Sequence, residues 1–330
     1  MNTQISDAID VAEEKVRLDA QIKKILANKK ILSWIVKYTM KEFAEMDFNM
    51  IESCIEGEPE VSKVPVYPGK TNMESITGLS TEDKVPNEGE AIYDIRFYII
   101  LPGKGREPIK IIINLETQND YYPGYDLVTR AVFYCARMLS AQLGTEFSTN
   151  VNDPKKYDNI KKVYSIWICF NTPRYAANTI TEYCMTQKAH YGSFKGKARY
   201  DLLSVVMICL ANSKKNETCE EQNKLIQMLT TLFATEMDKD EKKKKLQEQY
   251  GIPMDDGFGT EVDDMGNVSE YFISRGLEKG MELGMEKERT QIIQKALNNG
   301  KTTEQVSEFL SIPLDEVRQV ELEMELVQSV

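Results

Sequence analysis

The sequence predicts an α/β domain with a mixed β-sheet, followed by a helical extension. Apolar residues recur at helical spacing near the start of the chain, apolar segments with strand character fill its middle, and a helical segment separates two of these strands. The expected order is helix, strand, strand, strand, helix, strand. Elements in this order are typical of an α/β layer.

Two helices are expected between residues 16 and 46, with a break near Asn28. Residues 57–90 are rich in Pro, Gly, Ser, Thr and Glu, which predicts a short strand at Val61–Tyr67 within a long loop. Further strands are expected from their apolar patterns. They are Ala91–Leu101, Ile109–Gln118 and Val163–Phe170.

A helix is expected at about Tyr125–Leu143, because Pro123 and Gly124 precede this segment and Gly144 follows it. The following run VYSIWICF is apolar at nearly every position, which is typical of a strand covered on both faces. Ile180–Gln187 and Leu202–Leu210 fit further strands or a buried helix. Residues 220–250 have a helical and increasingly charged pattern.

The chain divides by composition into a domain at residues 1–252, an acidic, glycine-containing linker at 253–269 and a helical, acidic tail at 270–330. In the tail, Gly276, Gly280 and Gly284 recur every four residues, which favours close helix packing or self-association. ALNNGKTTEQVSEFLSIPLDEVRQVE predicts a helix-turn-helix-like pair with Thr302 or Thr303 as N-cap. Its second helix starts with acidic residues, so protein interaction or homo-oligomer packing is favoured over DNA reading.

Composition excludes several classes of site. The single histidine and the absence of any CxxC pair argue against a histidine-rich zinc site, a Ser-His-Asp triad and a Cys-His nucleophile. Catalysis would have to rely on carboxylates and on a metal that they bind. The chain also lacks a long apolar span and the basic-then-apolar order of a signal peptide, which predicts a cytoplasmic protein without a membrane partner.

The net charge of −11 is concentrated at one end of the chain. Residues 254–330 hold 17 acidic and 7 basic side chains, a balance of −10, whereas residues 1–253 hold 35 and 34. Local basic clusters in this near-neutral body suit a phosphate backbone, although solvated surface lysines are the simpler interpretation of any one cluster. The clusters are Lys23, Lys24, Lys29 and Lys30, and Lys188, Lys195, Lys197 and Arg199.

The two strands on either side of Gly105 predict a β-hairpin with a defined register. With the turn centred on Gly105, opposed residues have numbers that sum to 210. On the odd-numbered, apolar face, Ile95, Phe97, Ile99 and Leu101 then each meet an apolar residue. Asp94 then faces Glu116 on the polar side, with Cβ atoms about 4.5–5.5 Å apart. Like charges this close repel one another.

A divalent cation would offset that repulsion, because Mg²⁺ takes carboxylate oxygens and water as ligands and activates water at phosphoryl centres. Gln118 follows Glu116 by two residues and points to the same side, where it can hydrogen-bond the attacking water. The alternative is an ordinary hairpin with a wet polar face on which both acids stay solvated.

The chain resembles the PD-(D/E)XK nuclease family transposases, related to recombination-promoting nucleases of bacteria. The resemblance rests on DAQIKKILANKKILSWIVKYTMKEF, YDIRF, INLETQND and YDLVTRAVFYCARMLSAQ, over roughly residues 15–190. It implies a restriction-endonuclease-like αβββαβ core, DNA phosphodiester hydrolysis with Mg²⁺ or Mn²⁺, and a bacterial cytoplasmic setting.

The resemblance also implies roles for single residues. Asp94 matches the second motif, and Glu116 and Gln118 match the E-x-Q form in which Gln replaces the usual Lys. Asp19 resembles the acid of the opening helix, with Glu42 and Glu45 as alternatives on a neighbouring helix.

In the helix after the hairpin, Arg130, Tyr134 and Arg137 lie at positions i, i+4 and i+7 and share one face. They suit a phosphate track or, equally, a structural role. The expected function is a Mg²⁺-dependent DNA endonuclease acting in recombination or transposition. The alternative is a nuclease-fold protein with weak or no cleavage that binds DNA or another protein.

Overall fold

The computed structural model describes residues 17–61, 82–85, 89–103, 108–119, 121–143, 146, 156–211, 223–233, 237–264, 284–285 and 288–328. It divides into two compact units, residues 1–272 and 273–330, and each is described by itself. None of the described helices is long and apolar enough to cross a membrane.

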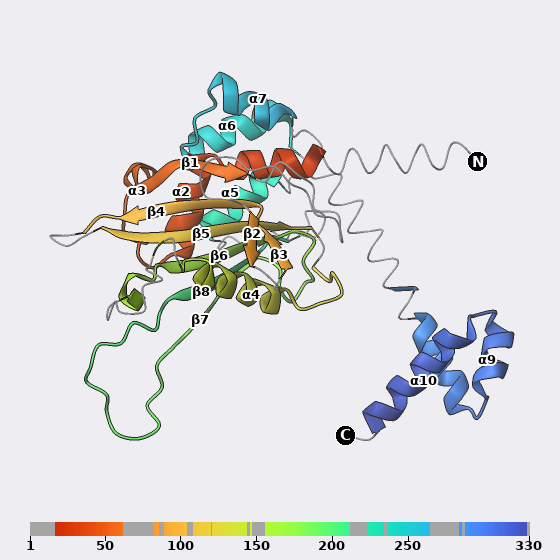
Figure 1. The fold of residues 1–330 in the computed structure, drawn as a ribbon. Coiled ribbons are helices and arrows are strands. Elements are labelled where there is room, and N and C mark those ends of the chain that lie inside the picture. Colours follow the sequence, from red (N-terminus) through yellow and green to blue (C-terminus); the bar gives the residue numbers. More distant parts are fainter. Residues whose placement is uncertain are drawn as a thin grey trace. The chain divides into compact units, whose positions relative to one another are not determined.

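The first unit is an α/β domain built on a six-stranded mixed sheet (Figure 1). The strand order is β1-β4-β5-β6-β8-β7; β5, β6 and β8 run parallel, and the other neighbours pair antiparallel. The strands are β1 Ile55–Val61, β4 Ile95–Leu101, β5 Ile109–Gln118, β6 Lys162–Cys169, β7 Thr179–Cys184 and β8 Leu203–Cys209. A separate hairpin pairs β2 Glu82–Val85 with β3 Gly89–Ile92.

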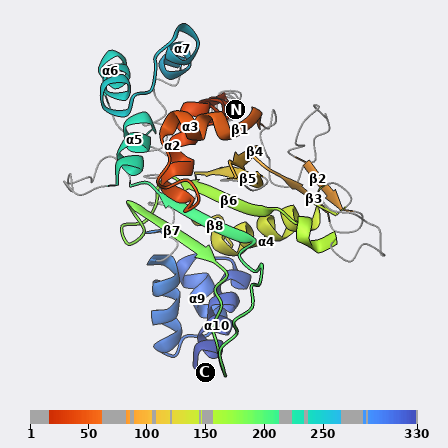
Figure 2. The same cartoon turned by 90° about the vertical axis from the view of Figure 1, so that its left-hand side faces the viewer.

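Helices cover both faces of the sheet, and Figures 1 and 2 show α4 on the face opposite α2, α3 and α5. The main core lies under helical residues 17–26 and α2, and the second core lies under α4. The helices that follow residues 17–26 in the described part of this unit are α2 Lys29–Thr39, α3 Phe48–Cys54, α4 Leu127–Ser140, η1 Lys156–Asn159, α5 Lys224–Phe233, α6 Lys239–Tyr250 and α7 Asp256–Asp264.

The expected break at Asn28 is confirmed. The side chain of Asn28 accepts a hydrogen bond from Lys30 N at 2.9 Å and caps the start of α2. Strand β6 is also as expected, since every residue from Lys162 to Cys169 is buried between the two helical layers. The observed elements therefore confirm an α/β domain with a mixed sheet.

The structure adds to the sequence-based expectation in several places. Strand β1, Ile55–Val61, is not among the expected strands, and residues 62–67 of the strand expected at Val61–Tyr67 lie outside the described residues. The segments at 180–187 and 202–210, which fit either strand or helix by sequence, contain β7 and β8. Part of the expected linker forms α7, because Phe258 and Val262 bury their side chains in the main core.

The hairpin register is confirmed: Ile95 pairs with Leu115, Phe97 with Ile113 and Leu101 with Ile109, so each pair sums to 210. Its polar face, however, is buried over part of its length. Arg96 and Asn114 are buried, and the Asn114 amide donates a hydrogen bond to Ser165 Oγ at 3.3 Å. The interpretation in which both acids stay solvated is therefore wrong, because Asp94 and Glu116 are buried as well.

Strand β1 forms one edge of the sheet and is irregular. Its register against β4 shifts between Glu56 and Glu60, and Gly57 within this bulge has φ +63°, a conformation that glycine adopts readily. Glu56 and Glu58 are exposed beside Pro59. The edge thus carries a bulge, charges and a proline together.

The second unit contains helical residues 288–298, α9 Thr303–Leu310 and α10 Leu314–Gln328 around a small apolar core. Thr302 caps α9: Gln305 N donates to Thr302 Oγ1 at 3.3 Å, and Thr302 N donates to Gln305 Oε1 at 3.1 Å. The expected helix pair and one of its two candidate caps are confirmed. Gly276 and Gly280 lie outside the described residues.

Candidate functional site

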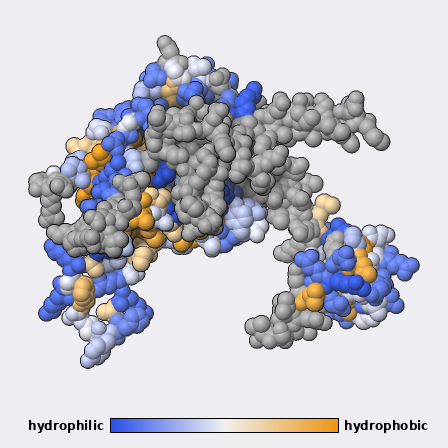
Figure 3. All heavy atoms as spheres, viewed as in Figure 1, coloured by the Kyte–Doolittle hydropathy of each residue, from blue (hydrophilic) through white to orange (hydrophobic). Residues whose placement is uncertain are grey.

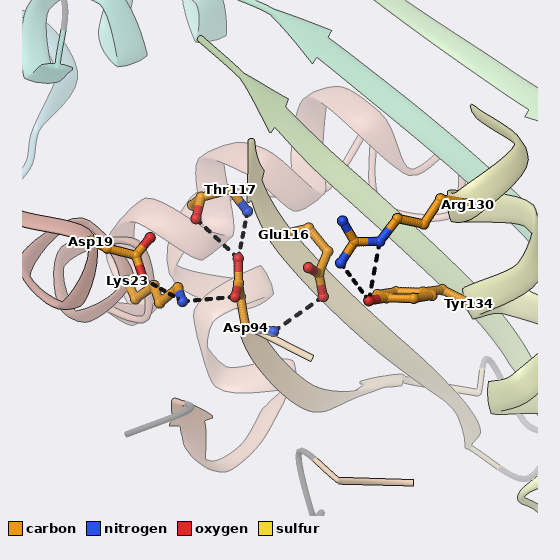
Figure 4. A network of polar contacts seen from close by, with 7 residues as sticks. All are labelled: Asp19, Lys23, Asp94, Glu116, Thr117, Arg130 and Tyr134. Atoms are coloured by element: carbon orange, nitrogen blue, oxygen red, sulfur yellow. Dashed lines mark hydrogen bonds and ion pairs between the residues drawn. The ribbon is translucent and has the colours of Figure 1, made fainter. Parts of the chain in front are cut away.

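Asp94 and Glu116 lie together at the carboxyl end of β5, where it runs beside β6. Asp94 directly precedes β4, and its backbone N–H donates a hydrogen bond to Glu116 Oε1 at 3.1 Å (Figure 4). Glu116 is paired in the parallel ladder with Trp167 of β6. Both acids are buried, with 7% of Asp94 and 4% of Glu116 exposed.

The side chains of Tyr93 and Asp94 depart from the expected alternation. The alternation predicts Tyr93 on the odd-numbered apolar face, yet its ring packs edge-on against Tyr134 of α4, with ring centroids 5.3 Å apart. The chain bends at Asp94, so the alternation of β4 does not continue into Tyr93. Figure 4 shows the two carboxylates on different sides of β5, with different partners.

The Asp94 carboxylate is fully engaged. Its Oδ2 accepts hydrogen bonds from Thr117 N at 2.8 Å and from Thr117 Oγ1 at 3.0 Å, and its Oδ1 lies 2.8 Å from Lys23 Nζ. Asp94 is therefore a buried acid whose charge is already balanced.

Lys23 comes from helical residues 17–26 and bridges two acids (Figure 4). Its Nζ lies 2.6 Å from Asp19 Oδ2, one helical turn earlier, as well as 2.8 Å from Asp94 Oδ1. Burial alone would lower the pKa of Lys23, but the two carboxylates outweigh burial and raise this pKa. An ammonium group thus occupies a position where a cation is stabilised by two acids.

Glu116 has the opposite electrostatic setting. Burial, followed by the nearby charge of Asp94, raises the pKa of Glu116 well above its usual range. The Asp94 N–H and the positive charges of Arg130 and Lys23 oppose this rise without cancelling it. Among the described residues, only Oε1 of this carboxylate accepts a hydrogen bond, which makes Oε2 its more available oxygen.

Arg130 and Tyr134 of α4 lie on the Glu116 side of β5 (Figure 4). Arg130 donates to Tyr134 OH from Nε at 3.2 Å and from Nη2 at 2.7 Å, and it donates from Nη1 to Tyr125 OH at 2.6 Å. Its guanidinium also lies 5.3 Å from the ring centroid of Trp167. Burial, then the charge of Glu116, raises the pKa of Tyr134 to about 12, so this phenol stays neutral and accepts from Arg130.

Of the other residues expected at the site, some lie near Asp94 and Glu116 and others do not. Gln118 is the last residue of β5, half-buried and two positions beyond Glu116. Arg137 is buried on α4. Glu42 belongs to a different cluster, since its carboxylate binds Lys162 Nζ at 3.0 Å and Tyr164 OH at 2.8 Å. Asp19 is therefore the helix acid that reaches Asp94, through Lys23.

The sequence interpretation misses two functional neighbours. It assigns Lys23 only to a basic cluster, although the i, i+4 spacing from Asp19 indicates an ion pair. It gives Thr117 no role, because this residue falls on the apolar face by alternation, yet its N–H and hydroxyl hold Asp94. No sequence signal indicates that the bend at Asp94 turns the carboxylate toward Thr117.

Carboxylate oxygens are the ligands that Mg²⁺ prefers, so Asp94 and Glu116 have the right chemistry for it. Within the described part of the chain, no three carboxylate, histidine or cysteine side chains converge as a metal-binding group. Lys23 Nζ lies between Asp19 and Asp94, so an ammonium group separates Asp19 from the pair formed by Asp94 and Glu116. No family model matches the chain, and neither a curated protein nor a solved structure matches it significantly.

Proposed function

We propose that this chain is a metal-dependent DNA endonuclease acting in recombination or transposition, with its reaction centre at Asp94 and Glu116. The observation that carries the proposal is the buried contact between Asp94 N and Glu116 Oε1 at the carboxyl end of β5. This edge of parallel strands is where α/β sheets place their ligands. The raised pKa of Glu116 adds support, because such shifts gather at functional sites.

Asp94 and Glu116 are the residues that would hold Mg²⁺, with Mn²⁺ as a substitute and Asp19 as a further acid nearby. The cation would supply charge neutralisation at a phosphoryl group and lower the pKa of a water molecule. For Asp94 to serve together with Glu116, its carboxylate has to leave Lys23 and Thr117 and turn toward the Glu116 side of β5. The ammonium group and the metal therefore compete for the same oxygen.

The other residues would bind phosphate and orient the attacking water. Arg130 presents a guanidinium beside Glu116, and guanidinium groups suit bidentate contacts with phosphate. Tyr125 and Tyr134 hold this guanidinium in place through their hydroxyls. Gln118 lies two residues beyond Glu116 on the same strand, from which its amide can hydrogen-bond an attacking water. After displacement, Lys23 remains a positive charge near the reacting phosphate.

The second candidate is a nuclease-fold protein that binds DNA or another protein without cleaving. A specific observation favours it: Lys23 and Thr117 already satisfy both oxygens of Asp94. A carboxylate in such a network stabilises the fold without a metal. Cleavage would then be absent even though the acids are buried together.

The test is cleavage of supercoiled plasmid DNA by the full chain with Mg²⁺ or Mn²⁺. Asp94→Asn and Glu116→Gln remove one negative charge each while keeping the shape of the side chain. We expect both to lower the cleavage rate at least about 100-fold, because phosphoryl transfer depends on charge neutralisation at the metal.

Glu42→Gln is the matched control, since Glu42 is also a partly buried, ion-paired acid of the same domain but contacts Lys162 and Tyr164 instead. It should cleave at close to the wild-type rate once folding is verified by circular dichroism. Equal rates in all four proteins, or no cleavage by wild type with either metal, would reject the nuclease and favour the second candidate.

A further inference from the structure

The connection between β7 and β8, residues 185–202, has an unusual charge for this chain. Its segment MTQKAHYGSFKGKARY contains Lys188, Lys195, Lys197 and Arg199 and no acidic residue, although the whole chain has a net charge of −11. We call residues 185–200 the β7–β8 arm. A basic, acid-free segment in an acidic chain attracts a polyanion.

The arm exposes aromatic rings beside these charges. Every residue from 185 to 200 is exposed; Tyr191 is 101% exposed and Phe194 is 62% exposed. Figure 1 shows the arm running away from the sheet, and Figure 3 shows its surface as mostly hydrophilic. Exposed rings spaced between lysines suit a ligand that offers both phosphates and flat aromatic faces.

Local contacts give the arm a defined shape. At its base, Arg199 donates to the backbone oxygens of Asp158 and, at 2.8 Å, Ile160. At its tip, Gly192 has φ +63°, which glycine tolerates. A Cβ atom at Gly196 would lie 2.5 Å from the Phe194 ring, so only glycine lets that ring rest against the backbone. Arg199 is an anchor, and the three lysines are left for a partner.

We infer that the β7–β8 arm binds single-stranded nucleic acid, with Lys188, Lys195 and Lys197 contacting phosphates and Tyr191 and Phe194 stacking on unpaired bases. Lysines track a nucleic acid backbone without regard to sequence. Exposed rings add affinity only where bases are unpaired, because duplex bases are already stacked on one another. An anionic membrane would need a more continuous apolar surface than the separate exposed side chains of Met185, Tyr191, Phe194 and Tyr200.

The inference extends the proposed function by naming an unpaired strand as partner, but it does not require cleavage. Binding is therefore measured in EDTA, by fluorescence anisotropy of a labelled oligo(dT) of about 20 nucleotides, a length that exceeds typical single-strand site sizes, and of a labelled mixed-sequence duplex. A protein that does not cleave plasmid DNA can still be tested for binding by the arm. A protein that does not bind oligo(dT) through the arm can still be tested for cleavage.

Removing the charges should weaken the binding of both ligands. Lys188→Gln/Lys195→Gln/Lys197→Gln is expected to reduce the slope of log affinity against log salt for oligo(dT) by about 2, because each phosphate that a lysine neutralises on a single strand contributes about 0.7 to this slope. The control Lys224→Gln/Lys239→Gln/Lys244→Gln removes the same charge from α5 and α6 and should retain the wild-type slope.

Removing the rings should weaken the binding of one ligand only. Tyr191→Ala/Phe194→Ala is expected to lower oligo(dT) affinity at least about tenfold while leaving duplex affinity and the salt slope unchanged. Phe133→Ala/Phe309→Ala, at exposed rings outside the arm, is the control. The inference is overturned if the arm variants bind oligo(dT) like wild type, if ring removal weakens duplex binding equally, or if only phosphatidylserine vesicles bind in an arm-dependent manner.

Discussion

Lys23 Nζ lies 2.8 Å from Asp94 Oδ1 and 2.6 Å from Asp19 Oδ2, so one ammonium group joins the first helical segment to the start of β4. Its side chain is 4% exposed. Breaking a buried pair on one side costs about 3–5 kcal/mol, because the remaining charge is left without compensation. This lysine holds the two acids in a position that a divalent cation could take over.

Lys23→Met should therefore lower the free energy of unfolding by about 3–5 kcal/mol in EDTA and increase affinity for Mn²⁺. The ammonium no longer competes with the metal, and the two uncompensated acids attract it. Thermal unfolding with increasing Mn²⁺ measures both effects, since a ligand that binds only the folded state raises the midpoint. The shift should be larger for Lys23→Met than for wild type.

The control for metal rescue is Lys23→Met/Asp94→Asn, in which the ammonium and the carboxylate charge are removed together. Mn²⁺ should not stabilise this variant. Equal Mn²⁺ shifts in all three proteins would show that the metal binds elsewhere in the chain.

Glu116→Gln should stabilise the metal-free protein in a pH-dependent way. Burial and Asp94 raise the pKa of Glu116 in the folded state, whereas in the unfolded chain it titrates near about 4.3. The folded protein thus binds the proton more tightly, and the free energy of unfolding of wild type falls as the pH rises from that value through the folded pKa. Glutamine does not ionise, so it avoids this destabilisation.

The gain in melting temperature of Glu116→Gln over wild type should be large at neutral pH and disappear as the pH approaches about 4. Exposed Glu248 provides the control, because Glu248→Gln changes a carboxylate that stays in water and should shift the midpoint little at every pH. A gain that is constant with pH would contradict a raised pKa at Glu116.

Two tyrosines bind the same guanidinium but differ in burial, with Tyr134 7% and Tyr125 51% exposed. Tyr134→Phe leaves Arg130 with an unsatisfied, partly buried N–H pair and should lower the free energy of unfolding by about 1–3 kcal/mol. Tyr125→Phe lets water replace the missing hydroxyl and should cost less than about 0.5 kcal/mol. Urea denaturation measures the free energy of unfolding of both variants. Equal destabilisation would contradict the prediction that burial prevents water from replacing the Tyr134 hydroxyl.

Thr302 caps α9 in the second unit through its reciprocal contacts with Gln305. Thr302→Ala removes the acceptor for Gln305 N and should destabilise this helix by about 0.5–2 kcal/mol. Hydrogen exchange of the amides at 303–310 should speed up accordingly, while Thr302→Ser retains most of the protection. Unchanged exchange in Thr302→Ala would mean that apolar packing alone holds α9.

Much of the fold follows from the sequence. Apolar pairing in the hairpin defines a single register, because a one-residue shift would place Ile113 opposite Arg96 or Tyr98 instead of Phe97. The helix break at Asn28 is equally visible from its capping chemistry. The helix α7 escapes prediction because its glycines and acids suggest a linker, while Phe258 and Val262 provide enough apolar surface to pack it on the core.

The site is only partly predictable. Hairpin register brings Asp94 next to Glu116, but alternation cannot assign Tyr93, since an apolar core lies on each face of the sheet. The Tyr93 ring packs against the ring of Tyr134, which in turn packs against Trp167, and the chain bends at Asp94. The position of Lys23 depends on how the first helical segment packs, which no local pattern reveals.

The irregular edge at β1 limits how this protein can assemble. Gly57 and the register shift distort the row of outward backbone groups, Pro59 lacks an N–H to offer, and Glu56 and Glu58 repel an identical neighbour. A second molecule therefore finds no straight template there on which to add its own strand. Along that border, the bulge, the proline and the charges therefore oppose aggregation by sheet extension.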